Sequence, residues 1–276
     1  GVIALANNWL SRHHRIEDGA GFKLRNIDPD HTGGFRDRGE AEEQTRADLE
    51  KLAKLQERFY IDNRHSLLVV LQAIDTGGKD GTIKHVFRGI DPLGCQVTAF
   101  KAPTHEELDH DFLWRINRAL PAKGNFGIFN RSHYEDVTVV RVHDLVPERV
   151  WTRRYDHINR FEKLLADENT IIVKFFLYIS KDEQKKRLNE RLEDPEKHWK
   201  FDPRDLVERR HWGEYLDAYQ EMIRRCSTSW APWYVVPADK KWYRNCVVAN
   251  ALVDTLSKLD LKLPKLSFDP AKMKVV

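Results

Sequence analysis

The stretch SLLVVLQAIDTGGKDGT, residues 66–82, combines an apolar run with a glycine-rich turn. Residues 66–74 are almost continuously apolar and rich in branched side chains, as in a strand that is buried on both faces of a parallel sheet. The turn that follows contains three glycines, which let the backbone bend sharply and direct its N–H groups inward. The segment therefore predicts a strand, then a phosphate-binding loop, then a helix.

The loop offers both backbone and side-chain groups to a phosphate chain. The start of the helix adds a partial positive charge, and Lys79 supplies a full one. The match to the Walker pattern G-x-x-x-x-G-K-[ST] is partial, because Ala73 stands at the first glycine and Asp80 replaces the Ser or Thr that holds Mg²⁺. A plain glycine-rich turn is the alternative, but the position between a buried strand and a helix favours a phosphate loop. The candidate phosphate-binding residues here are Gly77, Gly78, Lys79, Asp80, Gly81 and Thr82.

Asp75 is an unusual residue in such a loop. A carboxylate repels phosphate unless a cation or a proton transfer makes use of it. We therefore expect Asp75 to bind Mg²⁺ or to position the reacting groups, and the alternative is that it caps the turn.

Strand and helix patterns alternate along the rest of the chain. Four further strands are predicted at 95–100, 126–129, 170–179 and 232–237. Helices are predicted near 39–62, 79–89, 106–119, 148–168, 181–192, 203–226 and 241–260. This alternation predicts an α/β fold, with right-handed crossovers and a five-stranded parallel sheet that helices cover on both faces. Ligands bind at the carboxyl ends of such strands, so chemistry is expected in the loops that begin near 74, 101, 130 and 180.

The loop NRSHYEDV, residues 130–137, carries an acidic pair. Mg²⁺ needs only one or two carboxylates when waters complete its shell, so Glu135 and Asp136 are candidate ligands. Asp136 lies seven positions beyond Phe129, whereas a usual Walker B aspartate ends its strand directly. A solvated acidic pair is the alternative.

Two arginines near the same strand are candidates for binding a nucleotide. Arg131 follows the strand at once, where a guanidinium can hold a phosphate through two hydrogen bonds, and Arg141 is close enough in sequence to assist. Asn130 is grouped with them as a nucleotide-binding candidate, and structural ion pairs are the alternative for both arginines. His133 is expected to form hydrogen bonds within the loop, because no second His or Cys stands nearby at zinc spacing.

The segment from about 183 to 207 follows the fourth strand and is rich in charge. Arg187 and Arg191 fall four residues apart on one helical face. Nine basic and seven acidic residues lie between 185 and 210, so a solvated mixed-charge surface is the alternative. The place in chain order is that of a mobile lid, whose arginines neutralise a transferring phosphoryl group. The candidate phosphate-binding residues of this segment are Lys186, Arg187, Arg191, Lys197 and Lys200.

Composition limits the function and the surroundings. The 46 basic and 43 acidic residues leave a formal charge of +3, which is too small for a protein that coats nucleic acid or an anionic membrane. Three cysteines without a CxxC pair indicate a reducing compartment. No segment is long enough for a transmembrane helix, so we expect a cytoplasmic protein that binds neither membranes nor nucleic acid. The expected organisation is an extension at 1–38, one domain at 39–265 and a tail at 266–276.

Four stretches together resemble the family-2 polyphosphate kinases, and the resemblance runs from about residue 22 to about residue 258. They are DTGGKDGT (75–82), FNRSHYEDV (129–137), EQKKRLNERLEDPEKHWKF (183–201) and STSWAPWYVVPADKKWYRN (227–245). The resemblance implies a thymidylate-kinase-like P-loop kinase fold with a helical lid. With its extension FKLRNIDPD (22–30), the chain looks most like the subgroup that phosphorylates both nucleoside monophosphates and diphosphates.

The resemblance also implies roles for the candidate residues. Arg131 would hold the acceptor phosphate, while Arg187 and Arg191 would touch the transferred phosphoryl group and polyphosphate. The implied catalytic residues are Asp75, Lys79, Asp136, Arg187 and Arg191. The implied ligands of Mg²⁺, with Mn²⁺ as an alternative ion, are Asp75, Glu135 and Asp136. The implied partners are inorganic polyphosphate, the nucleotides AMP, ADP, ATP and guanine nucleotides, and further copies of the chain in a homodimer or homotetramer.

The sequence thus predicts a kinase that transfers phosphoryl groups reversibly and in line between polyphosphate and AMP or ADP. No phosphoenzyme is expected, because no suitably placed histidine nucleophile is evident. One rival is an ATP-dependent nucleoside or small-molecule kinase. Another is a noncatalytic protein that binds polyphosphate or nucleic acid.

Overall fold

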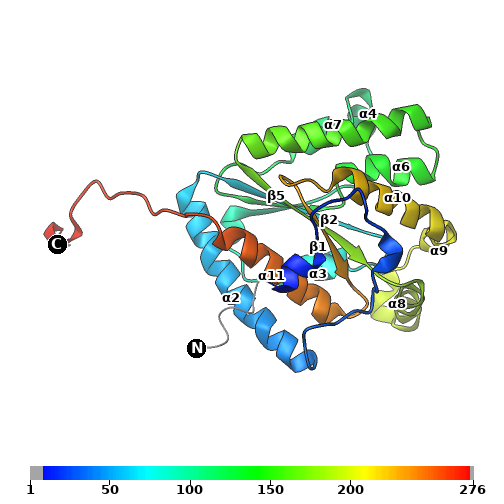
Figure 1. The fold of residues 1–276 in the computed structure, drawn as a ribbon, viewed down its shortest axis with the longest axis horizontal. Helices are drawn as coiled ribbons and strands as arrows, with labels where there is room; N and C mark the ends of the chain where they lie inside the picture. The colour runs from blue at the N-terminus through cyan, green and yellow to red at the C-terminus, as the bar shows by residue number, and fades with distance from the viewer. Residues whose placement is uncertain (1–8, 274–276) are drawn as a thin grey trace.

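A six-stranded sheet forms the centre of the computed structural model, which describes residues 9–273 (Figure 1). Its strand order is β1-β6-β5-β2-β4-β3. The strands are β1 (Arg15–Ile16), β2 (Ser66–Ala73), β3 (Cys95–Ala99), β4 (Phe126–Asn130), β5 (Thr170–Tyr178) and β6 (Trp233–Pro237). The five predicted strands are confirmed and run parallel to one another. Every residue of β2 is buried, which explains its continuous apolar run.

The sequence did not indicate β1, which makes the sheet mixed. Arg15 and Ile16 pair antiparallel with Tyr234 and Trp233 of β6. Two residues are too few to show an alternating pattern. The pairing depends instead on the docking of α1 (Trp9–His14), which packs against α11 (Lys241–Ser257).

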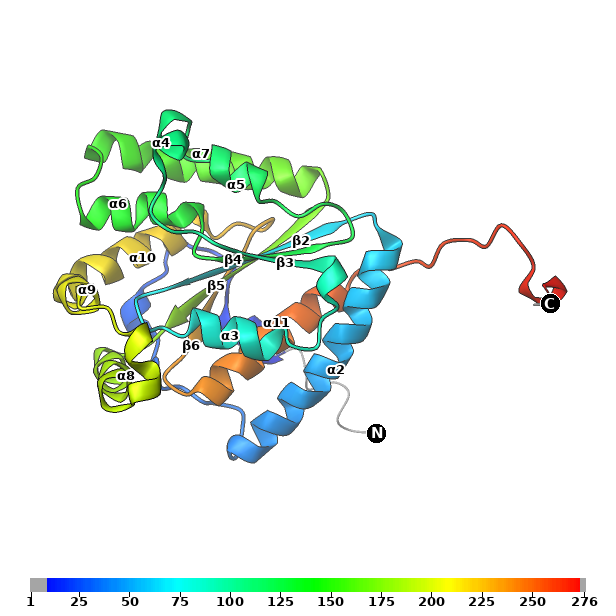
Figure 2. The same cartoon turned by 180° about the vertical axis from the view of Figure 1, so that it is seen from behind.

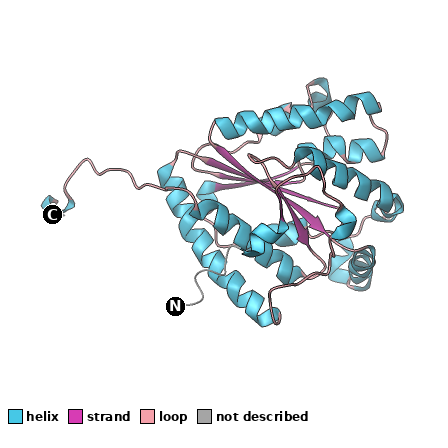
Figure 3. Ribbon diagram, in the orientation of Figure 1, coloured by secondary structure: helices cyan, strands magenta, loops and turns pink. Residues whose placement is uncertain are grey.

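Helices cover both faces of the sheet, and the strands form a narrow layer between them (Figures 2 and 3). On one face lie α2 (Arg38–Asp62), α3 (Lys79–Val86) and α11. On the other lie α6 (Val139–Val142), α7 (Glu148–Asp167) and α10 (Trp212–Cys226). The remaining helices are α4 (His105–Asp109), α5 (Trp114–Arg118), α8 (Lys181–Glu193), α9 (Arg204–Glu208) and the 3₁₀ turns η1 (Leu24–Asn26), η2 (Pro92–Gly94), η3 (His133–Val137), η4 (Pro195–Lys200), η5 (Arg209–His211) and η6 (Pro270–Lys272).

Two predicted helices are interrupted, and two short helices were missed. The helix predicted at 106–119 divides into α4 and α5, because the Asp111 carboxylate accepts a hydrogen bond from Leu113 N at 2.9 Å and supports a turn. The helix predicted at 203–226 is divided by η5 into α9 and α10. The missed helices, α1 and α6, have only six and four residues, too few to show a helical period.

The described part of the N-terminal extension, residues 9–38, packs against the domain through α1 and β1. After α11, Leu259 and Leu261 still pack against the core, and the chain then runs away from the body of the molecule (Figure 1). Residues 1–8 of the predicted extension and 274–276 of the predicted tail lie outside the described residues. Between residues 9 and 273, no helix combines the length and apolarity needed to cross a membrane.

His14 makes the docking of this extension sensitive to pH. The side chain is only 4% exposed, and its Nε2 lies 2.9 Å from the Tyr243 hydroxyl. Burial, with the charges of His13 and His31, lowers the pKa of His14 to about 3. The unfolded chain therefore binds this proton below a pH of about 6.5 while the folded chain does not, so stability falls as the pH falls.

We expect this group to remove about 2 kcal/mol from the free energy of unfolding between pH 7 and pH 5. His14→Gln cannot take up this proton, so its stability should fall by about 2 kcal/mol less over the same range. Urea unfolding of both proteins at the two pH values measures the difference. An equal pH dependence in the two proteins would contradict the role of His14.

Candidate active site

The loop after β2 has a backbone that only small residues allow. A Cβ on Gly77 would collide with the Cβ of Ala73, and one on Gly78 with the guanidinium of Arg244. Gly78 has φ +97°, and Thr76 is left-handed at φ +63°. Gly78 is the N-cap residue of α3, so the loop leads straight into a helix start, as predicted.

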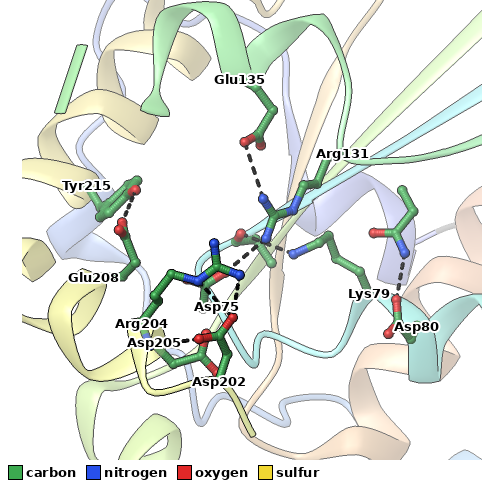
Figure 4. A network of polar contacts seen from close by, with 12 residues as sticks. Asp75, Lys79, Asp80, Arg131, Glu135, Asp202, Arg204, Asp205, Glu208 and Tyr215 are labelled. Carbon is green, nitrogen blue, oxygen red and sulfur yellow. Dashed lines mark hydrogen bonds and ion pairs between the residues drawn. The ribbon is translucent and has the colours of Figure 1, made fainter. Parts of the chain in front are cut away.

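Lys79 lies beside a charge chain that Asp75, Arg131 and Glu135 form (Figure 4). Arg131 pairs with Asp75 at 3.1 Å and with Glu135 at 3.7 Å. Lys79 is 9% exposed, and its Nζ donates to Ala73 O at 3.4 Å. Burial, together with the charge of Arg131, lowers the pKa of Lys79 against the opposing effect of the acids. A buried cation with so few fixed partners can act on a phosphate without first leaving a strong ion pair.

Asn130 and Arg131 differ in what they touch. Asn130 donates to the Asp80 carboxylate at 2.6 Å and so ties the end of β4 to the start of α3. Arg131 has φ +63°, an uncommon backbone conformation that directs the chain out of β4. Two predicted nucleotide-binding residues thus reach the phosphate loop itself.

Asp136 faces a different group of charges. Its Oδ1 lies 3.3 Å from the Arg154 guanidinium, and its Oδ2 is buried with no hydrogen-bond partner among residues 9–273. Burial raises the pKa of Asp136 to about 6, although Arg154 and Arg115 act against it. The charge of Glu135 acts on both Asp136 and Lys79, so Glu135 connects the two halves of the site.

The carboxylates fit a metal ion whose coordination is completed by waters and substrate phosphates. No three or more His, Cys, Asp and Glu side chains in residues 9–273 are grouped so as to hold a metal ion alone. Mg²⁺ usually binds one or two carboxylates together with waters and substrate phosphates, so a smaller set suffices. The unpartnered Oδ2 of Asp136 supplies such an oxygen, with Glu135 beside it in sequence.

Arg187 points into the structure. It is buried, and its guanidinium donates to Thr76 O at 3.1 Å and to Ala238 O at 2.6 Å. It therefore braces the backbone of the phosphate loop against the end of β6. Arg191 is half-buried and binds Lys200 O at 3.0 Å and the Asp205 carboxylate at 3.3 Å, within the lid segment.

The other predicted cations contact neighbours within the lid segment. Lys186 and Lys197 pair with acids of their own segment, Glu183 at 3.8 Å and Asp194 at 2.8 Å. Lys200 lies over the ring of the exposed Trp199. These three side chains lie at the surface.

Arg141 contacts α7 instead of the phosphate loop. Its guanidinium lies over the Trp151 ring, 4.9 Å from the centroid. Of the predicted nucleotide-binding residues it is the one that the structure does not bring to the loop.

Several functional candidates were missed in the sequence. Arg244 is 3% exposed, lies beside Gly78, and hydrogen-bonds Asn245 at 2.9 Å; it forms no ion pair within the described chain. Burial, with the charge of Arg187, lowers the pKa of Arg244 to about 9. Burial and the charge of Arg187 also lower the pKa of Lys241. The basic run that contains them was visible, but only the packing of α11 brings it to the loop.

A cavity of about 480 Å³ opens at the carboxyl end of β3. Arg115 lies over the Phe100 ring and Arg118 over the Trp114 ring, with centroid distances of 5.4 and 4.7 Å. Arg115 also acts on Asp136, so the cavity adjoins the acidic pair. Aromatic faces with guanidinium groups suit a ligand that has a planar base and phosphates.

A glycine-rich loop after the central strand, a buried lysine at the helix start and carboxylates across the sheet define a P-loop kinase. Comparison with known proteins places the chain more narrowly. The profile of the polyphosphate kinase 2 (PPK2) family matches residues 36–264, and the chain belongs to this family.

Sequence similarity to relatives extends over most of the chain. A protein of Meiothermus ruber named AMP/ADP-polyphosphate phosphotransferase is 52% identical over 92% of this chain and 96% of its own length. An ADP-polyphosphate phosphotransferase of Rhodopseudomonas palustris is 45% identical over 84% of each chain. The crystal structure of polyphosphate kinase 2 from Arthrobacter aurescens TC1 superimposes with a TM-score of 0.91 at 47% identity, covering 95% of this chain and 94% of that one. The predicted family, fold and enzyme class are confirmed, and the ATP-dependent kinase is not favoured.

Proposed function

We propose that this kinase transfers the terminal phosphoryl group of inorganic polyphosphate to AMP and to ADP, with Mg²⁺. The observation that carries this is the charge chain of Asp75, Arg131 and Glu135 around the buried Lys79. The names of the Meiothermus and Rhodopseudomonas relatives support polyphosphate, AMP and ADP as substrates.

The donor lies along the phosphate loop. Lys79 and the amides at the start of α3 hold the phosphoryl group that moves. Arg244 lies beside Gly78, and Lys241 precedes it by three residues on α11; both supply positive charge to the next phosphates of the polymer. Arg187 keeps the loop backbone in place through Thr76 O and Ala238 O.

The acceptor enters from the cavity beside Phe100 and Trp114. Arg131 orients its phosphate toward the loop, and Arg115 stabilises the charge near Asp136. A nucleotide phosphate is already anionic at neutral pH, so its oxygen attacks without a general base. The bond to the bridging oxygen of the donor breaks, and the shortened polyphosphate leaves.

Positioning and charge neutralisation supply most of the rate in this reaction. Bound Mg²⁺ would neutralise charge on the donor and acceptor oxygens. Asp136 and Glu135 would hold it, with Asp75 as the ligand on the loop side. The lid at 183–207 closes over the phosphates and excludes water.

A product-resolved assay tests the proposal. Purified protein with polyphosphate, Mg²⁺ and AMP should yield ADP and then ATP, whereas ATP should not phosphorylate nucleosides. Ion-exchange chromatography separates the products. Nucleotide phosphorylation with ATP as the only effective donor would reject the proposal.

The assembly and the base preference belong to the same proposal. We expect a homodimer or homotetramer, use of guanine nucleotides alongside adenine nucleotides, and replacement of Mg²⁺ by Mn²⁺. Light scattering after size exclusion measures the first, and the same assay with GMP, GDP or Mn²⁺ measures the others.

A further inference from the structure

A buried polar network lies behind the turn that carries the acidic pair. Lys174 of β5, Glu162 of α7, and His133 and Tyr134 of η3 are all 0% exposed. The network joins three elements and reaches the last residue of α10, because Lys174 also donates to Cys226 O at 2.7 Å.

The hydrogen bonds of the ion pair are complete. Lys174 Nζ donates to Glu162 Oε2 at 2.7 Å and to the Tyr134 hydroxyl at 2.6 Å, which with Cys226 uses all three of its protons. Glu162 Oε1 accepts from the Tyr134 hydroxyl at 2.7 Å and lies 2.9 Å from His133 Nε2. Although burial opposes ionisation, Lys174 and His133 hold the pKa of Glu162 below its ordinary value.

A buried ion pair is seldom the most stabilising way to fill a core. Well-packed apolar residues of similar volume are often as stabilising as a buried ion pair, or more so. The charges add a defined orientation of the η3 side chains, since each hydrogen bond holds one of them in place. A 3₁₀ turn has poor internal hydrogen-bond geometry, so η3 depends on outside contacts for its position.

The two residues that follow the anchored rings are the carboxylates of the site. His133 and Tyr134 face the network, and Glu135 and Asp136 come next in the same turn. Ser132 holds the start of the turn, since its Oγ lies 3.0 Å from the side-chain amide of Gln72 and accepts from Tyr134 N at 3.2 Å. A shift of the rings would therefore move both carboxylates.

We propose that Lys174 and Glu162 are positioning residues, which act through His133 and Tyr134 to hold Glu135 and Asp136 opposite the phosphate loop. The proposal rests on the role proposed above for these two carboxylates. It predicts that loss of the network weakens metal binding and the rate of phosphoryl transfer more than it weakens substrate binding.

Tyr134→Phe is the most direct test, because it removes the hydroxyl between Lys174 and Glu162 and leaves the ring and the ion pair. Groups that orient metal ligands typically contribute 10- to 100-fold, so we expect kcat to fall roughly 10-fold or more. The KM values for polyphosphate and ADP should stay within about 2-fold, because the substrate-binding groups are unchanged. Binding of Mn²⁺, followed by loss of the free-ion EPR signal, should weaken by a similar factor of roughly 10.

Tyr155→Phe is the matched control. Tyr155 is also a fully buried tyrosine, on α7, and within the described residues its hydroxyl interacts with Arg141 and not with Lys174 or Glu162. This variant should match the wild type in kcat and in Mn²⁺ binding. Equal losses in both variants, or wild-type values for Tyr134→Phe, would overturn the positioning role.

A second variant covers the case in which Tyr134→Phe does not fold. In the double variant Glu162→Gln and Lys174→Met both charges leave together, so no buried charge remains unpaired. The same loss of kcat and Mn²⁺ affinity at unchanged KM is expected, and wild-type values would again reject the role. Failure of the proposed function looks different, because the wild-type protein itself would then form no product from polyphosphate.

Discussion

Lys79→Ala is expected to lower kcat for phosphoryl transfer from polyphosphate by roughly 10³-fold or more, since the charge on the moving group is then left without its nearest cation. The remaining cation of the charge chain, Arg131, is already shared between Asp75 and Glu135 and cannot replace it. Steady-state rates with ADP, Mg²⁺ and polyphosphate measure the effect.

Lys84→Ala is the control for this prediction. Lys84 lies on the same helix, α3, but is exposed, so the variant should keep wild-type rates. Circular dichroism should show native folding for both variants. A Lys79→Ala protein with more than about a tenth of wild-type kcat would remove the lysine from the mechanism, because a catalytic cation contributes far more than 10-fold.

The second large effect is expected at Asp136. Asp136→Asn should reduce kcat by roughly 10²-fold or more, because an amide is a much weaker ligand for a hard divalent cation than a carboxylate. Folding stability should not decrease. The amide oxygen can still accept from Arg154, and burial disfavours the charge of the native carboxylate.

Asp144→Asn provides the comparison. Asp144 is exposed and left-handed at φ +49°, a conformation that Asn tolerates. Its activity and its urea midpoint should equal those of the wild type. Asp136→Asn with full activity would show that Glu135 and Asp75 suffice for the metal, whereas a large loss of stability would show that Asp136 is a structural residue.

Some features of the site could be read in advance because they are local. The loop at 75–82 was recognisable from its glycines and from the buried strand before it. The alternation of strands and helices predicted the five parallel strands, since burial on both faces leaves an apolar run in β2, β4, β5 and β6, whereas the edge strand β3 is largely exposed. Chemistry was expected in the loops near 74 and 130, and the structure brings these two loops together through the hydrogen bond from Asn130 to Asp80.

Other features depended on partners that are distant in sequence. Arg187 was expected to reach over the phosphates, but the structure directs it to backbone oxygens of Thr76 and Ala238. Arg141 was grouped with Arg131, yet it lies against Trp151. A helical period shows which residues share a face, but it does not show which neighbour that face will meet.

The sequence by itself determined the order of elements, the phosphate loop and the candidate residues for phosphate and metal, because periodicity and turn chemistry act over a few residues. Only the tertiary structure decided that Arg244 lies beside Gly78, that Arg154 holds one oxygen of Asp136, and that a buried ion pair supports the acidic turn. The physical reason is that these contacts join residues far apart in the chain. Their geometry is set by how the helices pack on the sheet, and no local pattern records that packing.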